Sequence, residues 1–269
     1  MRLCRGALIA FVLAMPRPSL GQGLPALPSF GPDPQPRILF DVNIFNTASS
    51  PAHQRDYTTS FITFGETATT RATYASPQRV NSVPLDFGAT YMIARWFGAG
   101  FGYSRTTYEM TPSLAATIPH PVFLRSQATA TGTTGHLLSR HENENRLFVT
   151  LAPYRSNRFE VHLFGGPSFF SYSAQMVQTV SYAQTYDATK PQSTVTITGS
   201  TDGTVNGDTI GFSGGADFAY FLTKCCGVTG GFRISRGIVP IDEPLSGLSQ
   251  DVLVGSNVGF VGLRFRFGR

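Results

Sequence analysis

Apolar and polar residues alternate along several stretches of this chain with the two-residue period of a β-strand. The clearest stretch is 85–93, where Leu85, Phe87 and Ile93 fall on one face and Asp86 and Gly88 on the other. The alternation resumes at 97–104, directly after the three residues 94–96. Two alternating runs joined by so short a reversal predict a β-hairpin.

Eight strands can be placed in this way, at 38–44, 85–93, 97–104, 146–151, 160–169, 210–220, 228–234 and 260–267. Short turns at 94–96, 155–158 and 223–226 alternate with long polar loops at about 46–82, 109–142, 176–206 and 239–251. Within the loops, 61–64 and 194–197 are strand-like, and the first suggests that its flanking strands extend outward as a hairpin. The pattern predicts an all-β fold, an eight-stranded antiparallel up-and-down barrel whose long external loops all lie at one end.

The closing strand carries apolar residues on one face and charge on the other. The spacing Gly262-x-x-Phe265-x-Phe267 resembles the C-terminal assembly signal of bacterial outer-membrane β-barrels. The resemblance implies recognition by the barrel-assembly machinery. Two details depart from the family pattern, because 268–269 follow the last aromatic and Phe260 stands where a polar residue is usual. The alternative is the closing strand of a soluble β-sandwich.

Over about 37–267 the chain resembles the small outer-membrane β-barrel families of the outer-membrane protein A type. The resemblance rests on 86–103, 160–168, 211–221 and 262–267. It implies a transmembrane barrel in the bacterial outer membrane, in contact with outer-membrane lipids and present as a monomer. These segments specify an architecture and imply no particular activity.

The first residues predict export. Arg2 and Arg5 flank the apolar run 6–15, which is too short to span a membrane as a helix, and small residues precede a cut after Gly21. We therefore expect a signal peptide at 1–21, a proline-rich linker at 22–36 and the outer-membrane barrel at 37–269. Without the signal peptide, 18 basic residues face 16 acidic ones, which does not indicate nucleic-acid binding. Charged residues make up only 14% of the chain, against about 25% in ordinary domains, which favours a membrane barrel.

Alternation alone does not say which face of the strands lies inside. A soluble lipocalin-like barrel would turn the apolar face inward. The glycine-rich polar faces and the scarcity of lysine favour the opposite arrangement, because a narrow eight-stranded interior is crowded. The polar faces then place four acids, four arginines and one histidine inside: Asp41, Asp86, Arg146, Glu160, His162, Asp217, Arg233, Arg264 and Arg266.

Buried charge is costly unless it is paired, so we expect this set to form an interior ion-pair network. An eight-stranded barrel is just wide enough for side chains to fill it, and we interpret the network as a structural plug. The alternative is a narrow channel that the ion pairs gate. The sequence does not indicate which acid meets which arginine.

The sequence indicates no catalytic, cofactor or metal site. A lipid-modifying barrel enzyme would need Ser, His and an acid within hydrogen-bond reach, and no histidine has Ser or Thr two residues later. The segment 202–208 offers oxygens but lacks the closing Glu of a calcium loop. The adjacent Cys225 and Cys226 favour a tight turn over a strained disulfide. We therefore expect a non-enzymatic structural or surface-binding, adhesion-like role through the external loops.

Overall fold

The computed structural model describes residues 37–49, 55–74, 78–79 and 84–267. The expected signal peptide at 1–21, the linker at 22–36 and the terminal 268–269 lie outside the described residues. No helix in the described part is long and apolar enough to cross a membrane. The strands are β1 (Ile38–Ser49), β2 (Arg55–Thr63), β3 (Glu66–Tyr74), β4 (Gln78–Arg79), β5 (Leu85–Met92), β6 (Phe97–Met110), β7 (Ser113–Pro119), β8 (Gln127–Thr133), β9 (Leu138–Arg155), β10 (Phe159–Tyr186), β11 (Ser193–Phe221), β12 (Cys226–Asp242), β13 (Ser249–Val254) and β14 (Asn257–Phe267).

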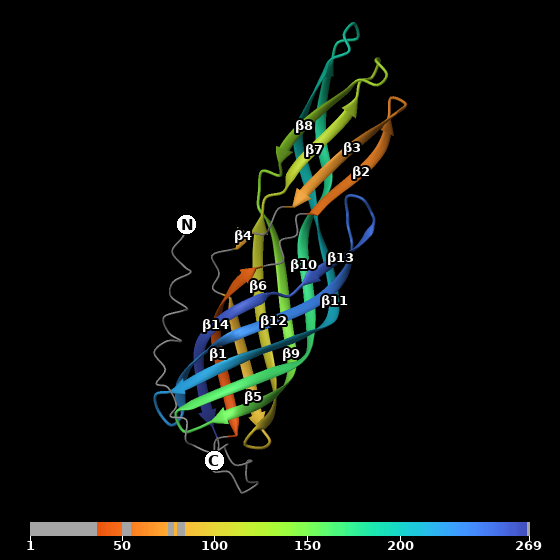
Figure 1. Cartoon of the computed structure of the whole chain (residues 1–269). Helices are drawn as coiled ribbons and strands as arrows, with labels where there is room; N and C mark the ends of the chain where they lie inside the picture. Colours follow the sequence, from red (N-terminus) through yellow and green to blue (C-terminus); the bar gives the residue numbers. More distant parts are fainter. Residues whose placement is uncertain (1–36, 50–54, 75–77, 80–83, 268–269) are drawn as a thin grey trace, which may run out of the picture. The chain divides into compact units, whose positions relative to one another are not determined.

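Eight of these strands form one closed antiparallel ring (Figure 1). The pairing runs β1–β5–β6–β9–β10–β11–β12–β14 and returns to β1. Each ring strand pairs with the next ring strand along the chain. The pairing of β1 with β14, from Ile38 opposite Phe267 to Phe45 opposite Phe260, closes the ring. The expectation of an all-β fold with a ring of eight up-and-down strands is confirmed.

The ring turns its apolar face outward and its charged face inward. On β1, Ile44 is 53% exposed, whereas Asp41 and Asn43 are buried. On β14, Val261 is exposed and Arg264 is buried. A soluble barrel would be built the other way round, so the lipocalin-like alternative is wrong.

The segments predicted as long loops are largely β-hairpins, so their description as loops is wrong. The strand-like character predicted at 61–64 and 194–197 is confirmed, because 61–63 lie in β2 and 194–197 lie in β11. Strands β2 and β3 pair within 46–82, β7 and β8 pair within 109–142, and β12 pairs with β13 across 239–251. Strands β10 and β11 stay paired as far as Tyr186 and Ser193, through most of 176–206. Threonine and serine on both faces hide the apolar alternation, but β-branched threonine still favours extended backbone.

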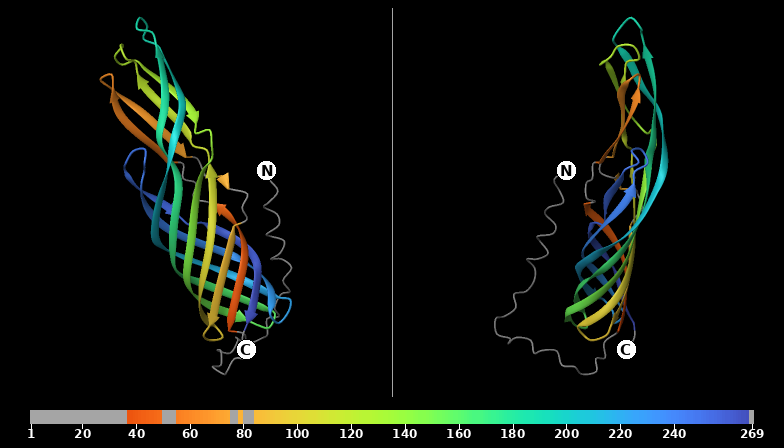
Figure 2. Two further views of the ribbon diagram at one scale, coloured as in Figure 1. Left: turned by 180° about the vertical axis from the view of Figure 1, so that it is seen from behind. Right: turned by 90° about the vertical axis from the view of Figure 1, so that its right-hand side faces the viewer.

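The hairpins pack into a second layered structure outside the ring. Strands β2, β3, β7 and β8 form a four-stranded sheet, which lies beside the extended parts of β10 and β11 in both views of Figure 2. Apolar residues of the sheet, such as Ala68, Ala116 and Ile118, pack against Val195 of β11. The hairpins therefore hold one another in place.

A larger apolar core lies where the hairpins meet the ring strands. Its buried residues come from β2, β3, β7, β9, β10, β12 and β13: Tyr57, Ala72, Tyr74, Leu114, Leu138, Phe170, Tyr172, Ala174, Met176, Val177, Val180, Val239, Ile241, Val252 and Val254. The Val177 amide donates a 2.7 Å hydrogen bond to the Tyr74 hydroxyl. Burial raises the pKa of the Tyr74 phenol, so it stays neutral in this core.

Replacing Leu138 with Ala should destabilise the protein because Leu138 is fully buried in this core. The expected loss is roughly 2–5 kcal/mol of unfolding free energy, since the removed methyl groups leave a cavity. The adjacent Leu137 is 53% exposed, and Leu137→Ala should cost no more than about 0.5 kcal/mol. Urea unfolding in detergent micelles, followed by circular dichroism, measures both; equal losses would contradict the packed core.

Candidate functional site

The barrel interior gathers charged side chains from all around the ring into successive layers. At the end with the short turns, Glu160 accepts from two arginines. The Arg155 Nε lies 2.6 Å and the Arg266 Nη2 3.0 Å from the same Glu160 Oε1. The Arg266 guanidinium also stacks on the ring of Phe221. Three strands are joined here, because β9, β10 and β14 each supply one of the charged groups.

The middle layer centres on Arg264. Its Nε lies 2.6 Å from Asp41 Oδ1 and its Nη1 lies 2.8 Å from Asp217 Oδ1. The same Nη1 lies 2.7 Å from His162 Nδ1. His162 Nδ1 also faces Asp217 Oδ1 at 3.5 Å. His162 Nε2 faces Glu160 Oε2 at 3.6 Å, so the histidine links the first two layers.

The third layer centres on Asp86. The Arg146 Nη2 donates to both carboxylate oxygens of Asp86, at 2.8 and 2.7 Å, and Arg233 pairs with the same carboxylate. Arg233 Nη2 lies 3.5 Å from Glu144 Oε2. The Ser168 hydroxyl donates to Glu144 at 3.0 Å. One carboxylate from β5 thus meets arginines from β9 and β12 across the barrel.

A fourth layer lies next to the apolar core of the hairpins. Arg140 pairs with Glu142, and the Gly255 amide donates to Glu142 Oε2 at 3.3 Å. The Arg140 guanidinium lies 5.6 Å from the ring centre of Tyr108 and 5.0 Å from that of Tyr172. Such contacts favour a buried cation. The layer completes a stack of ion pairs that continues to the base of the hairpins.

The structure places all nine predicted interior residues inside the ring, and each takes part in at least one of these contacts. Sequence reasoning missed Arg140, Glu142, Glu144 and Arg155. The first two were assigned to a loop, Glu144 precedes the predicted start of its strand, and Arg155 was assigned to a turn. With them, six arginines face six acids, and alternation continued along β9 would have found three of the four.

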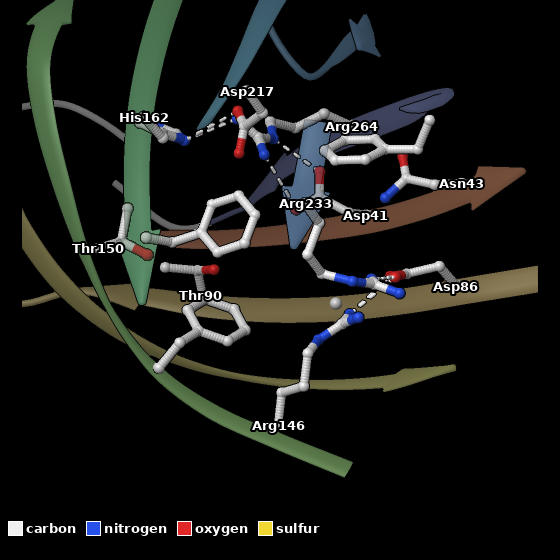
Figure 3. Close-up of a pocket in the computed structure, with 14 residues that line it drawn as sticks. Asp41, Asn43, Asp86, Thr90, Arg146, Thr150, His162, Asp217, Arg233 and Arg264 are labelled. Carbon is white, nitrogen blue, oxygen red and sulfur yellow. Dashed lines mark hydrogen bonds and ion pairs between the residues drawn. The ribbon is translucent and has the colours of Figure 1, made fainter. Parts of the chain in front are cut away.

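The space left between the layers is small. A cavity of about 40 Å³ lies between the second and third layers (Figure 3). Charged groups such as Arg264 and Arg146 border it together with the rings of Phe148 and Phe164. It has room for roughly one to three water molecules.

The residues of the predicted assembly signal lie on the closing strand β14. Phe265 and Phe267 stack on each other with ring centres 6.5 Å apart. Gly262 lies opposite Asn43 of β1, and a Cβ there would come within 2.2 Å of the Val42 carbonyl oxygen. A side chain at this position would therefore push apart the two strands that close the ring.

The remaining candidates for chemistry are scattered. Among the described residues, no group of three or more His, Cys, Asp or Glu side chains is placed to hold a metal ion. Cys225, in the turn between β11 and β12, and Cys226, the first residue of β12, are free thiols. On the outer face of the ring, Thr107 and His141 share a 3.0 Å hydrogen bond. His53 lies outside the described residues.

No protein-family model and no curated protein matches this chain. Among solved structures, it is similar to the solid-state NMR structure of outer membrane protein AlkL in DMPC lipid bilayers, with 9% sequence identity and a TM-score of 0.38. The match covers 93% of this chain and 98% of the AlkL chain.

Replacing Arg264 with Met should cost roughly 3–5 kcal/mol of unfolding free energy, because Asp41 and Asp217 would stay buried without their cation. Changing both acids to Asn in the Arg264→Met background should recover part of that loss. Urea unfolding in micelles measures each step, with the exposed Arg158→Ala as control. If the triple variant is as unstable as the sum of its separate changes, the three groups are not coupled.

Proposed function

We propose that the chain is an outer-membrane β-barrel protein that uses its outer hairpins to bind a surface or polymer, and that it is not an enzyme. Its partners are then outer-membrane lipids and the barrel-assembly machinery, with no nucleic acid, and the barrel is a monomer. The observation that carries the first part is the inside-out ring, with apolar side chains outside and paired charges within. The binding role rests on the ordered outer hairpins.

An apolar band surrounds the ring. It is formed by exposed outward residues of all eight ring strands: Phe40, Ile44, Leu85, Phe87, Phe101, Leu147, Val149, Leu163, Ile210, Phe212, Phe218, Phe232, Ile234, Val261 and Leu263. The band has a clear limit towards the hairpins, because Arg105 follows Tyr103 on the outer face of β6 and Asp208 precedes Ile210 on that of β11. An exposed apolar surface of this extent favours a lipid environment.

Aromatic residues mark the other limit of the band. Tyr91, Trp96, Tyr154, Tyr220 and Phe267 are exposed near the end with the short turns. Trp and Tyr rings favour the boundary between lipid and water. The short turns then face the periplasm and the hairpins face outward from the cell, the usual orientation of outer-membrane barrels.

Replacing Val149 with Arg tests the apolar band. Val149 is 51% exposed within the band, so a charge there should cost roughly 2–4 kcal/mol in lipid vesicles. Asn145 lies four residues earlier on the same face of β9, and Asn145→Arg should cost about 0–1 kcal/mol near the boundary. Urea unfolding from vesicles measures both, and a tolerated Val149→Arg would contradict lipid contact at this position.

Two observations favour binding by the hairpins over transport. The interior ion pairs join strands across the barrel, and the cavity beside them has a volume of about 40 Å³. The hairpins are ordered strands with their own apolar cores. Binding function often resides in segments that a rigid scaffold presents. The competing function is a narrow channel that opens when the interior pairs separate.

Planar-bilayer recording separates the two functions. We expect purified, heat-modifiable protein to insert without stable single-channel steps, because the interior is filled. Regular conductance steps would overturn the binding role in favour of the channel. A soluble periplasmic protein that stays monomeric without detergent would overturn the membrane assignment itself.

Removing the β7–β8 hairpin tests whether the hairpins mediate binding. Replacing 112–135 with a short Gly-Ser turn leaves all eight ring strands intact. We expect the variant to remain in the outer membrane, while attachment of expressing cells to glass, collagen or one another falls to the level of cells without the protein. Unchanged attachment, or none by the intact protein, would contradict a binding role.

A further inference from the structure

A groove lies between the β7–β8 hairpin and the start of β11, outside the part of β11 that pairs with β12. Residues 126–129, at the start of β8, form one wall and residues 191–195, at the start of β11, form the other. Its volume is about 410 Å³, within the range of roughly 300–1,000 Å³ that ligand sites occupy. Both walls lie in segments predicted as external loops with a binding role, 109–142 and 176–206.

The two walls are edges of sheets. Within the described residues, β8 pairs only with β7, and the first residues of β11 pair only with β10. Consecutive residues line the groove on both sides, whereas a sheet face would present every second residue. The groove therefore runs along backbone whose outward N–H and C=O groups have no strand partner in the described structure.

The groove is bounded along its length. At one end the Ser126 hydroxyl donates to the Pro191 carbonyl and ties the walls together. Farther along, β8 and β11 come into contact, since a Cβ on Gly132 would lie 3.4 Å from Ile197. The stretch between them offers about four residues of each edge, roughly 13 Å of strand.

The chemistry of the lining excludes several ligand classes. None of the nine residues is charged, so nothing in the lining favours an ionic ligand. None is aromatic, so no ring is available for a sugar to stack on. The groups present are backbone amides, the hydroxyls of residues such as Thr129 and Thr194, and the amides of Gln127 and Gln192.

We propose that this groove takes an extended, uncharged segment of a partner polypeptide as an added β-strand. Main-chain hydrogen bonds to the edges of β8 and β11 supply the affinity, and the small side chains of both walls select a partner without charge. The proposal rests on the proposed function, since it names the ligand class that the hairpins bind. It also explains why two adjacent edges stay uncharged, where edges normally carry charge to prevent pairing.

The test uses matched lysine substitutions in the full chain. Thr129 and Thr131 are both exposed on the same face of β8, but only Thr129 lines the groove. Thr194 and Thr196 form the same kind of pair on β11. A displayed library of seven-residue peptides without charged residues is selected against the intact protein in micelles, and selected peptides are synthesised.

We expect saturable binders that lose at least about tenfold in affinity with Thr129→Lys and Thr194→Lys, and less than about twofold with Thr131→Lys and Thr196→Lys. N-methylation of alternate peptide amides should abolish binding, because it removes main-chain donors.

No binder, or binders indifferent to Thr129→Lys and to N-methylation, would overturn the proposal. Groove-dependent binding of chito- or cello-oligosaccharides in place of peptides would overturn the polypeptide assignment. Cell attachment that persists in Thr129→Lys but is lost on removing the β7–β8 hairpin would refute the groove while leaving the proposed function intact.

Discussion

The pairing of buried charge inside the ring is the constraint on which the rest of this structure depends. Eight strands enclose an interior that side chains must fill, and here six arginines and six acids are buried in it. A single unpaired member would be expensive in such a place. The layers therefore tie the register of the strands to one another, because a one-residue slip would turn each charge outward.

The same constraint fixes what the outside can be. Because the polar face of each ring strand points into the ring, alternation leaves Ile, Leu, Val and Phe on the exterior. Arg264 and Leu263 illustrate the coupling, because adjacent positions on β14 serve a buried ion pair and the exposed apolar surface. The exposed apolar surface and the interior pairing are thus two consequences of one pattern.

Alternation predicted the ring and the placement of its charges because both follow from local sequence. Asp86 and Arg264 could be assigned to the inner face from their immediate neighbours alone. Their partners could not, since the contact of Asp86 with Arg233 joins residues 147 positions apart. Register and tilt decide such contacts, and no local pattern encodes them.

The hairpins were mistaken for loops for a different physical reason. Their strands carry Thr, Ser and Gly on both faces, as in 196–207, so no apolar face stands out. Their stability comes from packing small residues such as Ala116 and Ala130 against a neighbouring hairpin. A strand of this kind is recognisable only with its partner in view. The groove between β8 and β11 was missed for the same reason.

NMR in lipid nanodiscs can show whether the exposed apolar face of the ring contacts lipid. Nuclear Overhauser contacts with lipid acyl chains should appear at the methyl groups of Ile44, Val149 and Leu163, which face outward. The amides of β9 before Asn145 should show contacts with water alone. Water contacts and no lipid contacts at those three methyl groups would contradict the account.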